Sequence, residues 1–155
     1  MTFAVVRIRG QVNLSASVRD TLRMLRLTRA NHCVLVAESD ANKGMLQKVK
    51  DHITWGEVTA QVVEQLLTQR ARVSGTPLAA DHLQGTKFKS VEHLAAAVHA
   101  GKAKLDETAV TPVFRLPPPR HGYEGIKRAY RAGGALGYRG KEINDLLERM
   151  LGERD

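Results

Sequence analysis

The stretch from Pro112 to Lys141 constrains the fold more than any other part of the chain, because prolines and glycines are concentrated in it. It holds four of the five prolines, six of the 13 glycines and all three tyrosines. Proline lacks a backbone donor and glycine weakens helices and strands, so a long regular element is not expected here. The sequence therefore predicts an extended arm over these residues.

This arm is also strongly cationic. It carries seven of the 24 lysines and arginines of the chain and a single acid, Glu124. The net charge of +8 divides into +4 in residues 1–60, +1 in residues 61–110, +6 in residues 111–141 and −3 in residues 142–155. Charge gathered in this way indicates a polyanionic partner, since a solvated surface usually mixes its signs. A nucleic acid fits best, because cations neutralise phosphates and tyrosine rings stack on exposed bases.

Composition is that of one small globular domain. A chain of 155 residues that is 43% apolar can bury a core. The only cysteine, Cys33, excludes an internal disulfide and fits a reducing cytoplasm. No apolar run approaches the roughly 20 residues of a membrane span. The chain is expected to enter its first strand without a signal peptide and to be cytoplasmic.

The first 58 residues alternate between strand and helix patterns. This order, β-α-β-α-β, predicts an α+β sandwich with helices on one face of a sheet. The other face is either open for binding or covered by the rest of the chain. The expected elements are a strand at 3–9, a helix from Ser15 or Ser17 to about Leu27, a strand at 32–36, a helix capped by Asn42 and a strand at 53–58.

Cations are expected on the outer faces of these elements. Arg7 and Arg9 alternate with the apolar residues of the first strand, so they are predicted to lie on its other face. On the first helix, Arg19, Arg23 and Arg26 form a stripe beside the apolar one, with only Asp20 nearby to mix the signs. Such a stripe is either a solvated face or a binding face. Outward-facing lysines are expected on the second helix at Lys43, Lys48 and Lys50.

From Thr59 onward the pattern is helical. Thr59 and Ser90 are predicted to cap two helices, with a loop over residues 74–89 between them. A strand at 111–116 is expected to lead into the arm. A last helix at 141–151 is expected to anchor the far end of the arm through its apolar face, Ile143, Leu146, Leu147 and Met150.

Rival sites find little support in the sequence. A phosphate loop ending at Lys141 would need glycine at Ala135 and a hydroxyl at Glu142, and no strand is expected before it. The six histidines are scattered, so neither a metal nor another cofactor is predicted. No paired carboxylates suggest catalysis, so the chain is not expected to be an enzyme. His121 sits beside Arg120 in the arm, where it is expected to contact a phosphate or a base.

Several long segments carry a resemblance to a known family. The segments are AVVRIRG, TLRMLRL, NHCVLV, KGMLQKVKDHITWGEV, PVFRLPPPRHGYEGIKR and GGALGYRGKEINDLLERML. Together they resemble the long archaeal form of the universal large-subunit ribosomal protein L-thirty family. The resemblance implies a ferredoxin-like, RNA-binding core in residues 1–58, a helical extension in 59–110, and a strand, basic arm and C-terminal helix in 111–155.

The resemblance also implies a function. The chain is expected to be a structural constituent of the large ribosomal subunit that binds and stabilises ribosomal RNA during translation. Large-subunit RNA, with 5S RNA as a candidate, and neighbouring ribosomal proteins are the expected partners, with no membrane involved. The alternatives are a non-ribosomal RNA-binding protein and a protein-interaction module that docks through the acidic last helix. An enzyme acting on nucleic acid would need a titratable cluster near the arm, where Glu124 stands alone.

The residues predicted to contact RNA are drawn from the core and the arm. They are Arg7, Arg9, Arg19, Arg23, Arg26, Lys43, Lys48, Arg115, Arg120, His121, Tyr123, Lys127, Arg128, Arg131, Tyr138, Arg139 and Lys141.

Overall fold

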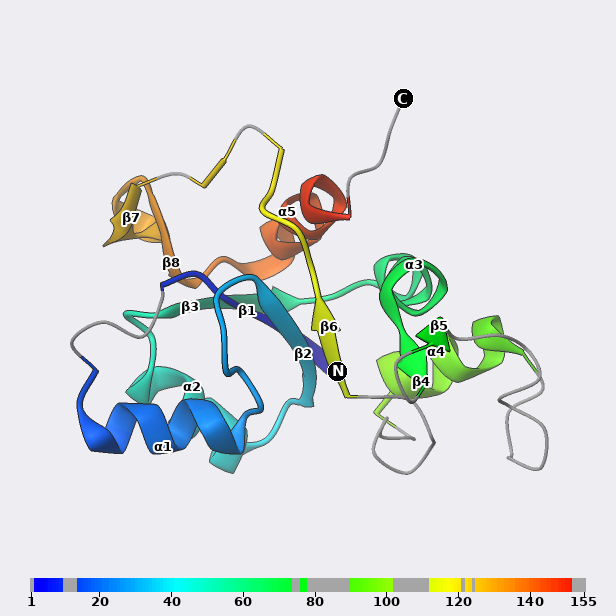
Figure 1. Ribbon diagram of the computed structural model, residues 1–155, viewed down its shortest axis with the longest axis horizontal. Helices are drawn as coiled ribbons and strands as arrows, with labels where there is room; N and C mark the ends of the chain where they lie inside the picture. The colour runs from blue at the N-terminus through cyan, green and yellow to red at the C-terminus, as the bar shows by residue number, and fades with distance from the viewer. Residues whose placement is uncertain are drawn as a thin grey trace.

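A computed structural model describes residues 2–9, 14–73, 76–77, 90–101, 112–120, 122–123 and 125–151. A six-stranded sheet with the order β6-β2-β1-β3-β8-β7 forms its centre (Figure 1). The strands are β1 (Thr2–Arg7), β2 (His32–Ala37), β3 (Ile53–Glu57), β6 (Val113–Arg115), β7 (Gly125–Ala129) and β8 (Gly134–Tyr138). The helices are α1 (Ala16–Met24), α2 (Asp40–Lys48), α3 (Ala60–Arg70), α4 (Val91–His99) and α5 (Ile143–Met150).

The predicted α+β class with a ferredoxin-like β-α-β-α-β core is confirmed. β1 pairs antiparallel with β2 on one side and with β3 on the other, and α1 and α2 lie on one face of these strands (Figure 1). Two short strands, β4 (Arg72–Val73) and β5 (Thr76–Pro77), pair separately. The rest of the predicted loop at 74–89 lies outside the described residues. None of the described helices is long and apolar enough to cross a membrane.

Hydroxyl side chains cap four of the helices. Ser15, Thr59 and Ser90 accept backbone N–H donors at the starts of α1, α3 and α4, as predicted. The predicted cap of α2 is wrong. Ser39, whose backbone is extended, caps this helix by accepting from the N–H of Asn42, so Asn42 falls inside the first turn.

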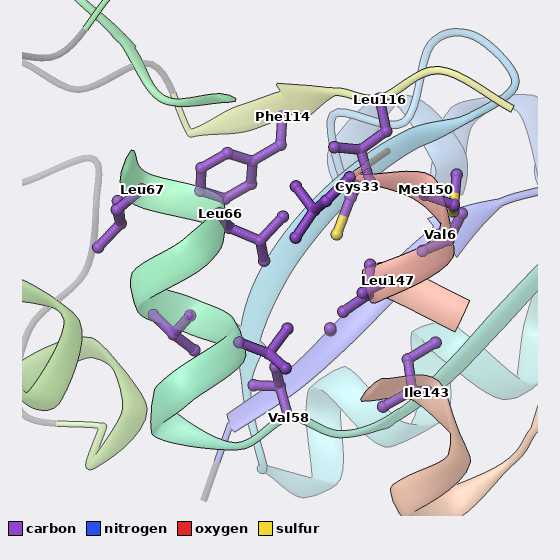
Figure 2. Packing of buried hydrophobic residues seen from close by; sticks show 14 of the residues in the cluster. Val6, Cys33, Val58, Leu66, Leu67, Phe114, Leu116, Ile143, Leu147 and Met150 are labelled. Atoms are coloured by element: carbon purple, nitrogen blue, oxygen red, sulfur yellow. The ribbon is translucent and has the colours of Figure 1, made fainter. Parts of the chain in front are cut away.

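Both faces of the central strands are buried. Phe3 and Val5 of β1 pack with α1 and α2. Ala4 and Val6 face the opposite way and pack against α3, α4, β6 and α5. Figure 2 shows this second cluster, in which side chains from α3, β6 and α5 converge on the sheet. Of the two alternatives for the second face, coverage by the rest of the chain is therefore the one observed.

The last helix anchors the chain as predicted. Ile143, Leu146, Leu147 and Met150 are fully buried on its inner side. A short 3-10 turn, η4 (Gly140–Glu142), precedes the helix, so α5 begins two residues later than predicted. The buried cluster draws residues from all three predicted segments, and the boundaries of those segments stay a prediction.

The strand predicted to lead into the arm is found as β6, which pairs with β2. The sequence predicted an extended arm without a long regular element, but the second half of the arm forms two short strands that join the sheet. β8 pairs parallel with β3, with Thr54 opposite Gly137 and Trp55 opposite Tyr138. β7 pairs with β8 in an irregular register, and the 3-10 turn η3 (Tyr130–Ala132) joins them.

Two glycines, Gly56 and Gly134, allow backbone segments to pack closely against each other. A Cβ on Gly134 would lie 2.1 Å from the backbone oxygen of Arg128. A Cβ on Gly56, in β3, would lie 1.9 Å from the backbone oxygen of Gly140. Real Cβ atoms do not approach backbone so closely, so Gly134 is required for β8 to lie against β7, and Gly56 is required for the turn at Gly140 to lie against β3.

Substitution of Gly56 tests this packing. We expect Gly56→Ala to lower the free energy of unfolding by about 1–3 kcal/mol or more, because the new methyl group displaces the turn at Gly140. Gly44→Ala is the matched control, since nothing lies within 4 Å of a Cβ there, and in helix α2 alanine should stabilise by about 0.5–1 kcal/mol. Urea unfolding measures both, and equal effects would contradict the packing of η4 on β3.

Candidate nucleic-acid interface

An open groove of about 1060 Å³ lies between α2 and the β7–β8 pair. Its floor comes from the sheet and its walls from α2 on one side and from β7 and η3 on the other. The groove exists because the sheet continues past β3 through β8 and β7. Its lining includes Phe3, Glu38, Lys43, Gln47, Lys50, Asp51, Trp55, Glu57, Lys127, Ala129, Tyr130, Arg131, Leu136, Gly137, Tyr138, Arg139 and Gly140.

Two aromatic rings meet at the floor of the groove. Trp55 and Tyr138 are register partners on β3 and β8, and their ring centroids lie 6.1 Å apart at a tilt of 53°. The Tyr138 hydroxyl donates a short hydrogen bond to Oε1 of Glu57, two residues along β3. This bond raises the pKa of Tyr138 to about 12, with a smaller contribution from burial, so the phenol stays protonated. The ring is therefore held by the hydrogen bond at its hydroxyl and by its contact with Trp55, while 47% of the residue remains exposed.

Cations outnumber acids along the groove. Five of its lining residues are cationic and three are acidic. Two of the acids are already engaged, since Glu57 accepts from Tyr138 and Glu38 pairs with Lys43 over 3.2 Å, so Lys43 reaches a phosphate only in competition with Glu38. Lys50, Lys127 and Arg131 are exposed at the walls, where a phosphate can reach them. The arrangement suits a polyanion that lies along the groove.

Arg139, in contrast to these exposed cations, is held inside the fold. Its Nε donates to Oγ1 of Thr54 and its Nη2 to the backbone oxygen of Ala135, each over 2.8 Å. The guanidinium stacks 4.8 Å from the centre of the Tyr130 ring. Only 6% of the residue is exposed, because these internal acceptors draw it into the fold. The predicted RNA contact at Arg139 is therefore not supported by its position.

Arg7 is likewise buried rather than outward-facing. Its Nε donates to the backbone oxygen of Arg9 over 2.9 Å and its Nη1 to that of Leu27 over 2.6 Å. It is 2% exposed, and this burial lowers its pKa. The strand alternation correctly separated Arg7 from Ala4 and Val6, but α1 and the loop after it cover the face on which Arg7 lies. Arg7 thus supports the fold in this structure.

Two histidines, His32 and His52, lie close enough to Arg7 to feel its charge. Burial, and then the charges of Arg115, Arg29 and Arg7, lower the pKa of His32. Burial lowers the pKa of His52 as well, followed by the charges of Arg9 and Arg7. Both imidazoles are therefore biased toward the neutral form. Among the described residues, no three His, Cys, Asp or Glu side chains gather as metal ligands.

The structure brings five of the predicted residues together in the groove, Lys43, Lys127, Arg131, Tyr138 and Arg139, and places the other described ones elsewhere. Arg19, Arg23 and Arg26 are exposed on and just after α1, and Lys48 is exposed on α2. Arg9 is half-buried beside Asp51. Among the predicted contact residues, the remaining exposed cations are Arg115, Arg120, Arg128 and Lys141.

Tyr123 packs inward, with its hydroxyl donating to Oδ1 of Asn31, and burial raises its pKa. This position leaves little of the ring for a base. His121 lies outside the described residues.

Some lining residues were not predicted as contacts. From the sequence, Trp55 is expected to be a core or sheet-face ring; it is 5% exposed and lines the groove. Lys50 was expected to point outward without a site being assigned to it. The signal that could have found Trp55 is the alternation of β3, because Trp55 and Glu57 share one strand face and a strand that pairs beside them presents its own alternate residues there.

Comparison with known proteins identifies the relatives of this chain. The sequence model of the family described as Ribosomal protein L30p/L7e matches residues 3–53. Large ribosomal subunit protein uL30 of Methanococcus vannielii is 46% identical over 154 residues, covering 97% of this chain and 100% of the relative. The proteins of the same name from Methanobrevibacter smithii and Methanosphaera stadtmanae are 45% and 44% identical over 151 residues, covering 96% of this chain and 99% of each relative.

Proposed function

The chain belongs to the ribosomal protein L30p/L7e family, and on that premise we propose that it is a structural constituent of the large ribosomal subunit that binds and stabilises ribosomal RNA. The observation that carries this proposal is the similarity of 44–46% to archaeal large-subunit proteins over nearly the whole of both chains. The family consists of structural proteins rather than enzymes. The chain accordingly works in the cytoplasm, on the ribosome.

The distribution of charge supports RNA as the partner. The exposed lysines and arginines of α2, β7 and η3 face one another across the groove, beside a fixed tyrosine ring. Release of counterions from crowded phosphates drives such contacts, and the shape of folded RNA gives them specificity. We therefore propose Lys43, Lys50, Lys127, Arg131 and Tyr138 as the principal contact set.

Further cations extend this face or lie apart from it. Arg128 and Lys141 are exposed on β7 and η4, next to the groove. The arginine stripe of α1 and the pair Arg115 and Arg120 are exposed on other parts of the surface. A protein embedded in folded RNA contacts it on several sides, so we propose these residues as secondary phosphate contacts. Arg7 and Arg139 are left out because internal acceptors hold their guanidinium groups.

Large-subunit RNA and neighbouring ribosomal proteins are the proposed partners. We add 5S RNA as a finer proposal, which rests on the family resemblance alone. Crosslinking of the assembled subunit, followed by sequencing of the RNA attached to this chain, tests it. The alternative of a protein module that docks through the acidic last helix could use only the outer face of that helix, because Ile143, Leu146, Leu147 and Met150 are buried within the chain itself.

Sedimentation tests the proposed function as a whole. A tagged copy of the chain, expressed in an archaeal host, should sediment with large subunits and remain there after a wash in moderate salt. Digestion of the RNA should release it, because the contacts depend on an intact ribonucleoprotein. A tagged chain that stays at the top of the gradient while host subunits sediment normally would contradict the proposal.

The salt dependence of RNA binding tests the groove. We expect the double variant Lys127→Gln, Arg131→Gln to bind ribosomal RNA fragments more weakly, because it neutralises fewer phosphates. The slope of log affinity against log salt should fall by roughly 0.7–0.9 for each phosphate that the variant no longer neutralises. Filter binding over a salt series measures that slope.

The matched control removes the same charge from another part of the chain. Arg70→Gln, Arg72→Gln takes two cations from the end of α3 and from β4, away from the groove. This double variant should bind almost like the parent chain. Equal weakening in the two double variants would show that net charge rather than the groove drives binding.

A further inference from the structure

Tyr138 is unusual among the described side chains. Three large hydrophobic residues in the described part of the chain are exposed, namely Met24, Ile126 and Tyr138, and only Tyr138 is aromatic. The residue is 47% exposed although its ring is tied to Glu57 and packed against Trp55. Exposure of an apolar ring costs free energy, and fixing the ring prevents it from folding away. An exposed ring that is held in place is what a stacking surface requires.

The surroundings of the ring match a nucleotide. Lys127 and Arg131 stand on one wall of the groove, and Lys43 and Lys50 stand on the other. The volume of the groove, about 1060 Å³, slightly exceeds the roughly 300–1,000 Å³ typical of pockets for small organic ligands, so a nucleotide fits within it. A base over the floor would therefore have cations within reach of the phosphates on either side of it.

The acids refine this placement. Glu57 lies at the hydroxyl end of Tyr138, where its negative charge keeps phosphates away from the floor. The same carboxylate has a second oxygen, and it can accept from the N–H of a base or the 2′-hydroxyl of a ribose. Phosphates are thus directed to the lysine and arginine walls while the neutral base takes the floor.

We propose that this groove holds an unstacked nucleotide of RNA, with its base against the Tyr138 ring and its flanking phosphates on the cationic walls. The inference rests on the proposed function and adds that the RNA at this site is single-stranded, because bases inside a duplex offer no free face. Cations alone would accept a duplex equally well, so the fixed ring carries the distinction.

Trp55 makes the proposal measurable. It is the only tryptophan of the chain, and it lies 6.1 Å from Tyr138. The experiment titrates the full chain with a short oligouridylate and, separately, with an abasic ribose–phosphate chain of equal length, and it follows tryptophan fluorescence and affinity. We expect oligouridylate to bind about tenfold or more tightly than the abasic chain, the gain from one base–aromatic stack, and to change the fluorescence.

Three variants separate the ring from general effects. Tyr138→Leu should bring the affinity for oligouridylate down to that for the abasic chain, whereas Tyr138→Phe, which keeps the ring, should retain most of the difference. Ile126→Ala is the matched control, because this residue is 46% exposed on β7 and does not line the groove. It should behave like the parent chain, and circular dichroism checks that each variant is folded.

The outcomes distinguish this inference from the function on which it rests. Equal binding of the two chains by the parent protein would overturn the base site and leave phosphate-driven RNA binding intact. A drop in affinity in Tyr138→Phe as large as that in Tyr138→Leu would also overturn it, since the affinity would then depend on the hydroxyl and not on stacking against the ring. Binding of neither chain, together with failure to bind ribosomal RNA fragments, would overturn the proposed function itself.

Discussion

The pairing of β8 with β3 is the interaction on which the rest of the structure depends. It places Tyr138 beside Trp55, carries β7 outward to form the far wall of the groove, and delivers the chain to η4 and α5. Gly56 allows the turn at Gly140 to lie directly on β3. Asn144 then ties the start of α5 to this strand, because its Nδ2 donates to the backbone oxygen of Glu57.

Different arginines of the arm have different roles, since one packs inside the fold and others remain at the surface. Arg139 is used internally, where it joins Thr54 of β3 to Ala135 of β8. Arg128 and Arg131 are exposed nearby and remain available for phosphates. A buried guanidinium with good acceptors rigidifies the pair of strands, and a rigid pair holds the surface cations in fixed positions. The cationic surface thus depends on an internal cation for its geometry.

Sequence patterns predicted the parts of this fold that are encoded locally. Alternation and helical periodicity placed β1, β2, β3 and the apolar side of α5, and hydroxyl residues marked three of the helix starts. The second half of the arm was predicted wrongly because a glycine can mark either a loop or a close contact between backbone segments. Locally, Gly134 indicates a loop, yet here it permits contact with the backbone of Arg128, and nothing in the neighbouring sequence reveals such a partner.

The candidate site shows the same limit. The cations of the arm were found from charge alone, and the structure places Lys127, Arg131 and Tyr138 together with Lys43 around one groove. Which arginines would be buried could not be predicted, because burial at Arg7 depends on a carbonyl 20 residues away and at Arg139 on a hydroxyl 85 residues away.

Amide hydrogen exchange on the RNA-free protein tests the docking of β8 most directly. Peptides covering 134–139 should be protected nearly as well as those of β3, whereas the exposed strand β7 should exchange faster. Rapid exchange throughout 134–139, with β3 protected, would contradict this account, because residues 134–139 would then form an arm that does not pack on the sheet.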